Sequence, residues 1–167
     1  MKPATWAEIR KLRGVAGYQF GKNVGWALFG KGTTIARSAR TGRIRHIYSK
    51  NELIATLRPK DGFLALTLHG AELILAKIKN PPNLVVGNSE VAEFIRSGGD
   101  LFAKHVVQAD EELRPAEEAI VVDPDGTLLA VGRTILAGHE MTRFKRGVAV
   151  RVRRGVDEVA ASRRPLQ

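Results

Sequence analysis

The stretch that decides the fold is NSEVAEFIRSGGDLFAKHVV, residues 88–107. Polar side chains at its start can cap a short helix, and apolar residues follow at helical spacing, namely Val91, Phe94 and Ile95. Gly98 and Gly99 then end the helix, because glycine adopts the left-handed conformation that frees the chain to turn. A strand begins near Leu101. The stretch therefore predicts a helix, an exposed glycine corner and a strand in quick succession.

The charge of the chain is unevenly distributed. The 167 residues include 27 Lys and Arg against 17 Asp and Glu, which gives a net charge of +10. Residues 1–83 carry +11, residues 84–140 carry −7, and residues 141–167 carry +6. A block of one sign repels itself unless a polyanion faces it. The N-terminal block therefore predicts contact with phosphates, and a merely solubilising surface is the alternative.

Several classes of protein are excluded by composition. No apolar run approaches the roughly 18 residues that a membrane span needs, and the N-terminus lacks the apolar middle of a secretory signal. We expect a cytoplasmic protein with no membrane partner. The absence of cysteine excludes disulfides and thiolate zinc sites, and no two of the four histidines lie at i, i+4. We expect no metal, no cofactor and no catalytic residues.

The N-terminal region reads as a mixture of helices and short strands. Thr5 and Glu8 match a capping box that starts a helix ending at Arg13, before Gly14. A second capping box, Ser49 with Glu52, predicts another helix, which Pro59 stops. β-prone runs occupy residues 24–29, 34–38, 43–48, 62–68 and 72–79, of which the last is also compatible with a buried helix.

Residues 80–82, Asn-Pro-Pro, combine helix-breaking residues with the change of charge sign, which predicts a domain boundary. We expect a basic N-terminal domain over residues 1–83, a second domain over 84–158 and a basic tail over 159–167.

The second domain continues with strands. Asp123 to Gly126 supply turn chemistry for a hairpin between residues 120–122 and 127–131. Residues 148–153 alternate valine with alanine or arginine, so that the valines are expected in the core and Arg151 and Arg153 on the opposite face. The alternative interpretation of these arginines is an edge strand protected by charge.

These motifs resemble a known family. Residues 84–158 resemble a PUA domain, an RNA-binding module, through VAEFIRSGGDLFAKHVV, AIVVDPDGTLLAVGR, AGHEM and RGVAVRVRRGVD in that order. The upstream motifs AGYQFGKNVG, SARTGRIRHIYS, DGFLALTLHGAELI and PPNLVVGNS are similar to the domain that precedes the PUA domain in archaeal archaeosine tRNA-guanine transglycosylases. The resemblance implies an α+β fold: a small N-terminal α+β domain with an antiparallel sheet, followed by a β pseudo-barrel with short helices.

The resemblance also implies an RNA-binding face made of the helix before the glycine corner, the strand after it and the last strand. The matching positions are Arg96, Gly98, Gly99, Lys104, His105, Arg151, Arg153 and Arg154. Basic residues before the last strand extend this patch: Arg143, Lys145 and Arg146.

A secondary set of phosphate contacts is expected in the N-terminal domain, at Arg37, Arg40, Arg43 and Arg45. Phe94 and Phe102 are expected to be buried, so the predicted recognition is of RNA shape and backbone more than of base sequence. Replacement of Arg151 and Arg153 is expected to weaken binding with little effect on stability.

We therefore expect a non-catalytic protein that binds tRNA or another structured RNA. The catalytic barrel and the cysteine-rich zinc site of the family's enzymes have no counterpart in these 167 residues. One alternative is a detached tRNA-binding subunit of a split tRNA-guanine transglycosylase or other RNA-modifying enzyme, whose catalytic subunit is a separate chain. Another is a protein-interaction module whose charge only solubilises it.

Overall fold

The protein consists of two compact units, Met1–Pro82 and Asn83–Gln167. The computed structural model describes residues 1–162. Of the predicted basic tail over residues 159–167, the part from 163 onward lies outside the described residues. No helix within residues 1–162 is long and apolar enough to cross a membrane.

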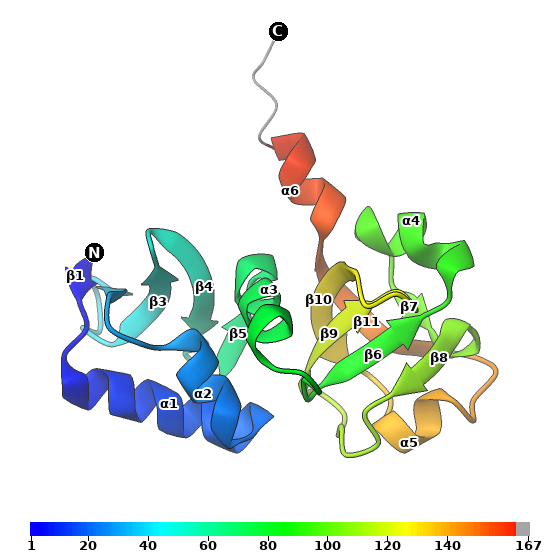
Figure 1. Cartoon of the computed structure of the whole chain (residues 1–167), viewed down its shortest axis with the longest axis horizontal. Coiled ribbons are helices and arrows are strands. Elements are labelled where there is room, and N and C mark those ends of the chain that lie inside the picture. Colours follow the sequence, from blue (N-terminus) through cyan, green and yellow to red (C-terminus); the bar gives the residue numbers. More distant parts are fainter. Residues whose placement is uncertain (163–167) are drawn as a thin grey trace, which may run out of the picture. The chain divides into compact units, whose positions relative to one another are not determined.

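The N-terminal unit packs three helices against an antiparallel sheet (Figure 1). The sheet runs in the order β1 (Lys2–Pro3), β2 (Thr33–Arg37), β3 (Ile44–Ser49), β4 (Glu52–Leu57) and β5 (Leu64–Leu66). The helices are α1 (Trp6–Phe20), α2 (Lys22–Leu28) and α3 (Leu68–Lys77). The capping box of Thr5 and Glu8 is present at the start of α1, as predicted.

Two of the predicted N-terminal elements are wrong because apolar spacing overrides local signals. Helix α1 continues past Gly14 to Phe20, since Leu12, Ala16 and Phe20 prolong its buried stripe at intervals of four. That burial outweighs the roughly 1 kcal/mol that glycine costs inside a helix. The predicted strand over residues 24–29 is helix α2, which buries Val24, Ala27 and Leu28 at i, i+3 and i+4.

The predicted second helix is also wrong, because its capping-box residues form a β-hairpin instead. Ser49 pairs with Glu52 across the turn between β3 and β4. Lys50 and Asn51 have φ of 48° and 67°, the left-handed pair that a two-residue hairpin turn requires. The run over residues 72–79, for which a helix had remained open, belongs to α3, capped by the Thr67 hydroxyl, which accepts from the Gly70 N–H.

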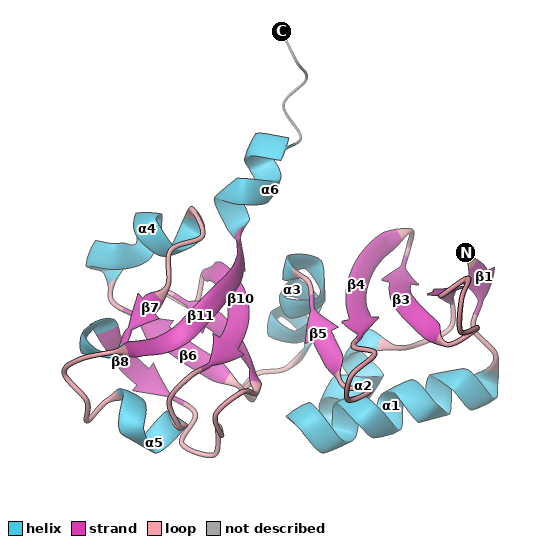
Figure 2. Cartoon of the chain, turned by 180° about the vertical axis from the view of Figure 1, so that it is seen from behind, coloured by secondary structure: helices cyan, strands magenta, loops and turns pink. Residues whose placement is uncertain are grey.

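The C-terminal unit is a curled six-stranded sheet with short helices (Figure 2). Its strand order is β7 (Leu101–Phe102), β11 (Val148–Gly155), β10 (Leu128–Thr134), β9 (Glu118–Val122), β6 (Leu84–Gly87) and β8 (Val106–Ala109). The helices are η1 (Ser89–Val91), α4 (Ala92–Arg96), η2 (Ala103–His105), α5 (Gly138–Met141) and α6 (Val156–Ser162).

The sheet of the C-terminal unit curls because its two edge strands are neighbours in sequence. β7 and β8 stand at opposite ends of the strand order, yet only the three residues of η2 join them. The edges must therefore come close, which produces a barrel-like sheet around a core that includes Ile95, Leu101, Val121 and Val150. The α+β class, the hairpin of β9 and β10 and the last strand are confirmed. The predicted strand over residues 101–107 is interrupted by η2.

Gly70 allows helix α3 to pack directly on strand β4. A Cβ at this position would collide with the carbonyl oxygen of Ile54, which belongs to the rigid sheet. We expect Gly70→Ala to lower the free energy of unfolding of the N-terminal unit by about 1–3 kcal/mol. Both tryptophans lie in this unit, so denaturation followed by tryptophan fluorescence measures its stability.

The matched control is Gly14→Ala on α1, where an added Cβ meets no atom within 4 Å. We expect this variant to stabilise the unit by up to about 1 kcal/mol through helix propensity. Equal stabilities for the two variants would contradict the packing argument.

Candidate nucleic-acid interface

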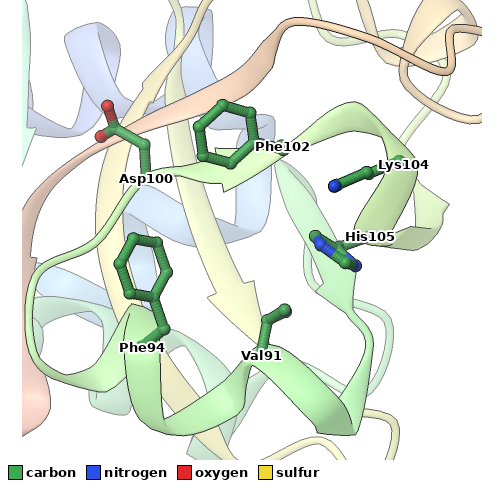
Figure 3. Close-up of a pocket in the computed structure, with 6 residues that line it drawn as sticks. All are labelled: Val91, Phe94, Asp100, Phe102, Lys104 and His105. Carbon is green, nitrogen blue, oxygen red and sulfur yellow. The ribbon is translucent and has the colours of Figure 1, made fainter.

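A hollow of about 240 Å³ lies beside the glycine corner of the C-terminal unit. Figure 3 shows its six lining side chains: Val91, Phe94, Asp100, Phe102, Lys104 and His105. Two come from the helical segment before the corner and four from the segment after it. The hollow therefore combines two aromatic rings with an ammonium, an imidazole and a carboxylate.

The two phenylalanines are not buried, contrary to the sequence prediction. Phe94 is 54% exposed and Phe102 is 39% exposed, whereas Ile95 is fully buried. A helix as short as α4 turns only a narrow stripe to the core, so Ile95 fills the stripe and Phe94 remains outside. Sequence reasoning thus missed two aromatic side chains that are available for stacking.

Gly99 and Gly98 have different roles at the corner. A Cβ at Gly99 would collide with the ring of Phe94, so glycine leaves the space that the ring occupies over the corner. Gly98 has φ of 101°, a left-handed conformation that ends the helix. The carboxylate of Glu158 lies over Gly98, where its Cδ would be 2.9 Å from an added Cβ. The close approach of an RNA phosphate to Gly98 would therefore have to displace Glu158.

Arg96 is also held by helix α6. Its guanidinium donates from Nε and Nη2 to Asp157, with a shortest distance of 2.9 Å. These hydrogen bonds lower the pKa of the Asp157 carboxyl and raise the pKa of Arg96, so both stay charged at neutral pH. The pair is about half exposed, which keeps its contribution to stability small.

Lys104 and His105 lie on η2, between β7 and β8. The N–H of Ala103 donates to the carbonyl of Gly147 at 2.9 Å, which brings the loop before β11 beside η2. That loop carries three exposed basic residues: Arg143, Lys145 and Arg146. The structure therefore places this basic loop next to the segment that supplies Lys104.

Arg151 approaches the corner through Asp100. Asp100 accepts from the Val152 N–H at 2.9 Å, and its other oxygen lies 3.8 Å from Nε of Arg151. The Arg151 side chain is 66% exposed, so this distant pair leaves it accessible to a ligand. Arg154 is exposed near the end of β11, beyond a register shift between β10 and β11.

Arg153 differs from its neighbour because it binds a buried carboxylate. Its guanidinium donates to both oxygens of Glu118, at 3.0 and 2.7 Å, and the Glu118 side chain is fully buried. This pair argues against the expectation that Arg153 can be replaced at little cost in stability. The two residues are 35 positions apart, and nothing in the local pattern connects them.

A second hollow, of about 460 Å³, lies on the face formed by β10 and β11. Its lining includes Arg133, Arg151 and Arg153. Arg133 stands directly opposite Arg151 in the strand register. Arg133 was not among the predicted RNA-binding residues. Its position near the end of the predicted hairpin strand could have indicated that it belongs to this basic face.

The four arginines expected to contact phosphates in the N-terminal unit fall into two groups. Arg37 pairs with Glu8 and donates to the Gly42 carbonyl, and Arg45 donates to the Leu57 carbonyl at 3.4 Å. Arg40 and Arg43 are exposed in the segment between β2 and β3. Across the part of the chain that is described, no group of His, Asp and Glu side chains is arranged to hold a metal.

Comparison with protein families assigns both units. Residues 10–81 match the patch-forming domain C2 of tRNA-guanine transglycosylase, and residues 83–156 match the PUA domain. The chain therefore joins a C2 domain of this type to a PUA domain. The resemblance inferred from the motifs is thereby confirmed.

The relatives of this C2–PUA chain are archaeal tRNA-guanine(15) transglycosylases. The chain is 38% identical over 149 residues to the enzyme of Methanobrevibacter smithii, covering 89% of the chain and 23% of that enzyme. It is 40% identical over 151 residues to the enzyme of Methanocaldococcus jannaschii, covering 90% and 23% respectively. The chain thus spans about a quarter of the length of these curated relatives, and it corresponds to their C-terminal accessory region.

Solved structures share the fold. A hypothetical protein of Pyrococcus horikoshii superposes with a TM-score of 0.74 at 19% identity, covering 92% of each chain. A conserved PUA-domain protein of Thermoplasma acidophilum gives 0.66 at 20% identity, again over 92% of each chain. At these identities the likeness concerns the fold alone.

The pair of Arg153 and Glu118 gives a direct test of the difference between neighbouring arginines. We expect Arg153→Ala to lower the free energy of unfolding by on the order of 3 kcal/mol, because it leaves a buried carboxylate without its guanidinium. We expect Arg151→Ala to change it by less than about 0.5 kcal/mol, as for an exposed residue. Chemical denaturation followed by circular dichroism measures both, and equal effects would refute the assignment.

Proposed function

We propose that this protein is a non-catalytic RNA-binding accessory protein that holds tRNA or another structured RNA. The observation that carries the proposal is the hollow at the glycine corner, with two exposed aromatic rings beside Lys104 and His105 on a PUA domain. An unpaired base can stack on a phenylalanine ring, and the ammonium can neutralise a neighbouring phosphate.

Asp100 adds selectivity to this hollow. Its carboxylate is an acceptor for ribose hydroxyls and base amino groups, and a 2′-hydroxyl is present only in RNA. The ring of Phe94 lies close over Gly99 and stays exposed to solvent, so a base can reach it. The exposed arginines around this site, Arg151 and Arg154 together with the loop of Arg143, Lys145 and Arg146, would contact the backbone.

Binding should depend steeply on salt, because phosphate neutralisation releases counterions. We expect tRNA to bind at low salt and to dissociate as salt increases. Absence of binding even at low salt would refute the function. The N-terminal arginines Arg37, Arg40, Arg43 and Arg45 would supply further phosphate contacts.

The hollow itself is tested by Phe102→Leu and Lys104→Ala. The first retains apolar contact but removes the stacking surface, and we expect it to weaken tRNA binding about 5- to 100-fold, since stacking contributes roughly 1–3 kcal/mol per base. The second should weaken binding and reduce the salt dependence by about one phosphate contact. Fluorescence anisotropy of labelled tRNA at two salt concentrations measures both.

Arg114→Ala is the matched control in the same unit, because this exposed residue also carries one positive charge and pairs with the nearby Glu117. We expect unchanged affinity for this variant. An equal loss for Lys104→Ala and Arg114→Ala would show that net charge, and not the hollow, governs the binding.

A second candidate function is a tRNA-binding subunit of a split transglycosylase or related RNA-modifying enzyme. The observation that favours it is that the curated relatives are about four times longer than the matched segment. We expect a separate catalytic chain to co-purify with the protein, and base exchange in tRNA only when the two are mixed. Activity of the catalytic chain alone at the same rate would exclude this role.

A further inference from the structure

The N-terminal unit has an exposed cluster of tryptophan and arginine that the proposed function does not use. Trp6 begins helix α1 and Trp26 lies on helix α2, and they are 57% and 64% exposed. The guanidinium carbon of Arg13 lies over both rings, 5.2 Å from the centroid of Trp6 and 3.6 Å from that of Trp26. We call these three residues the tryptophan cluster.

The cluster is held rigidly by the packing of α1 on α2. An added Cβ at Gly25 would lie 2.8 Å from the carbonyl oxygen of Arg13, so glycine is what allows the two helices to approach here. The Nε of Arg13 donates to the carbonyl of Phe29 at 2.8 Å. The guanidinium therefore has a fixed position before any ligand arrives, which reduces the entropy lost on binding.

A purely structural role does not account for the exposure of the rings. Cation–π contacts at exposed sites contribute about 0.5–1 kcal/mol, and they require only one face of each ring. Two large apolar side chains nevertheless remain more than half in water on one small unit. Adjacent exposed aromatic surface of this kind marks an interaction site.

The charge around the cluster selects the kind of partner. Arg10 is exposed on α1 one helical turn after Trp6, and Lys22 lies one helical turn before Trp26 on α2. Glu8, the acidic residue in the first turn of α1, is paired with Arg37. Hydrogen bonds from Thr5 lower the pKa of its carboxyl. Protein interfaces are depleted of charge at their core, whereas cations of one sign around aromatic rings suit a nucleic-acid strand.

We propose that the tryptophan cluster is a stacking platform for an unpaired nucleobase of an RNA, with Arg10 and Lys22 contacting the adjacent phosphates. The inference rests on the proposed RNA-binding function and adds a second contact site to it. Because every base has an aromatic face, the platform accepts single-stranded or flipped-out nucleotides without regard to sequence. It discriminates against regular duplex, whose bases are stacked on one another.

The chain offers a direct optical test, because its two tryptophans are both in the cluster. A single-stranded oligouridylate of ten nucleotides and a blunt-ended RNA duplex are titrated separately into the full-length protein at low salt. We expect the single strand to quench the tryptophan fluorescence and the duplex to leave it unchanged. Binding of the single strand without any change in fluorescence would overturn the proposal.

Variants of Trp26 separate stacking from a structural role. We expect Trp26→Leu to weaken binding of the oligouridylate about 5- to 100-fold by anisotropy of the labelled strand, and Trp26→Phe to retain most of the affinity. Because Trp26 is about two-thirds exposed, the core remains intact, and thermal unfolding followed by circular dichroism verifies this. Equal affinity of the leucine and phenylalanine variants would overturn the proposal.

The result is independent of the hollow in the PUA domain. If Phe102→Leu and Lys104→Ala weaken tRNA binding while Trp26→Leu binds the single strand as the wild type does, the proposed function stands and the tryptophan cluster is refuted. If no RNA of any kind binds, both are refuted. Binding of a protein partner to the tryptophan cluster in place of the oligouridylate would likewise overturn the proposal of a stacking platform.

Discussion

The close approach of strand β11 to the end of helix α4 is the constraint on which the C-terminal unit depends. A side chain at Gly155 would collide with the carbonyl oxygen of Arg96. The strand can approach the helix this closely only because position 155 is glycine. The approach aligns β11 with β7, where Val150 pairs with Leu101. Asp100, which precedes Leu101, then reaches both the backbone of Val152 and the side chain of Arg151. One steric requirement thus assembles the helix, the corner and the last strand into one surface.

Both candidate binding sites use the same physical arrangement, in which exposed aromatic rings lie beside cations on rigid elements. In the C-terminal unit the rings of Phe94 and Phe102 accompany Lys104, and in the N-terminal unit the indoles of Trp6 and Trp26 accompany Arg13. A ring provides a stacking face that is indifferent to sequence, and a cation provides attraction to the backbone. The combination suits an RNA with unpaired nucleotides.

Helix α6 brings acidic groups to the same corner. Asp157 and Glu158 lie against Arg96 and Gly98, where an incoming phosphate would be attracted. The carboxylates offset the positive charge of Arg96, and a bound phosphate would have to compete with them. Lys104 and Arg151 are therefore more accessible to a phosphate than Arg96, which is paired with Asp157.

The sequence predicted the C-terminal unit better than the N-terminal unit for identifiable reasons. Asp123 and Gly126 define one turn, and the alternation of residues 148–153 defines one strand, so the hairpin and β11 were predictable. The apolar run of residues 24–28 is compatible with the spacing of a strand and with that of a helix. Packing within the unit favours the helix, α2. The sequence around Ser49 and Glu52 matches a helix cap, and the left-handed backbone of Lys50 and Asn51 made it a hairpin.

The candidate site was predictable only in part, because its decisive contacts join distant residues. The glycine corner and the basic residues of β11 are legible in the sequence. The burial of Glu118 against Arg153 and the exposure of Phe94 depend on how the sheet curls, which no local pattern records. Sequence reasoning therefore found the basic residues but misjudged which side chains are available to a ligand.

The central claim is that folded RNA is gripped at the glycine corner of the PUA domain. Hydrogen–deuterium exchange of the full-length protein, with and without tRNA at low salt, tests it most directly. The account predicts slower exchange in peptides that cover residues 94–105 and 143–154, with no change in the acidic segment of residues 110–118. Protection confined to the acidic segment, with the corner unaffected, would contradict it.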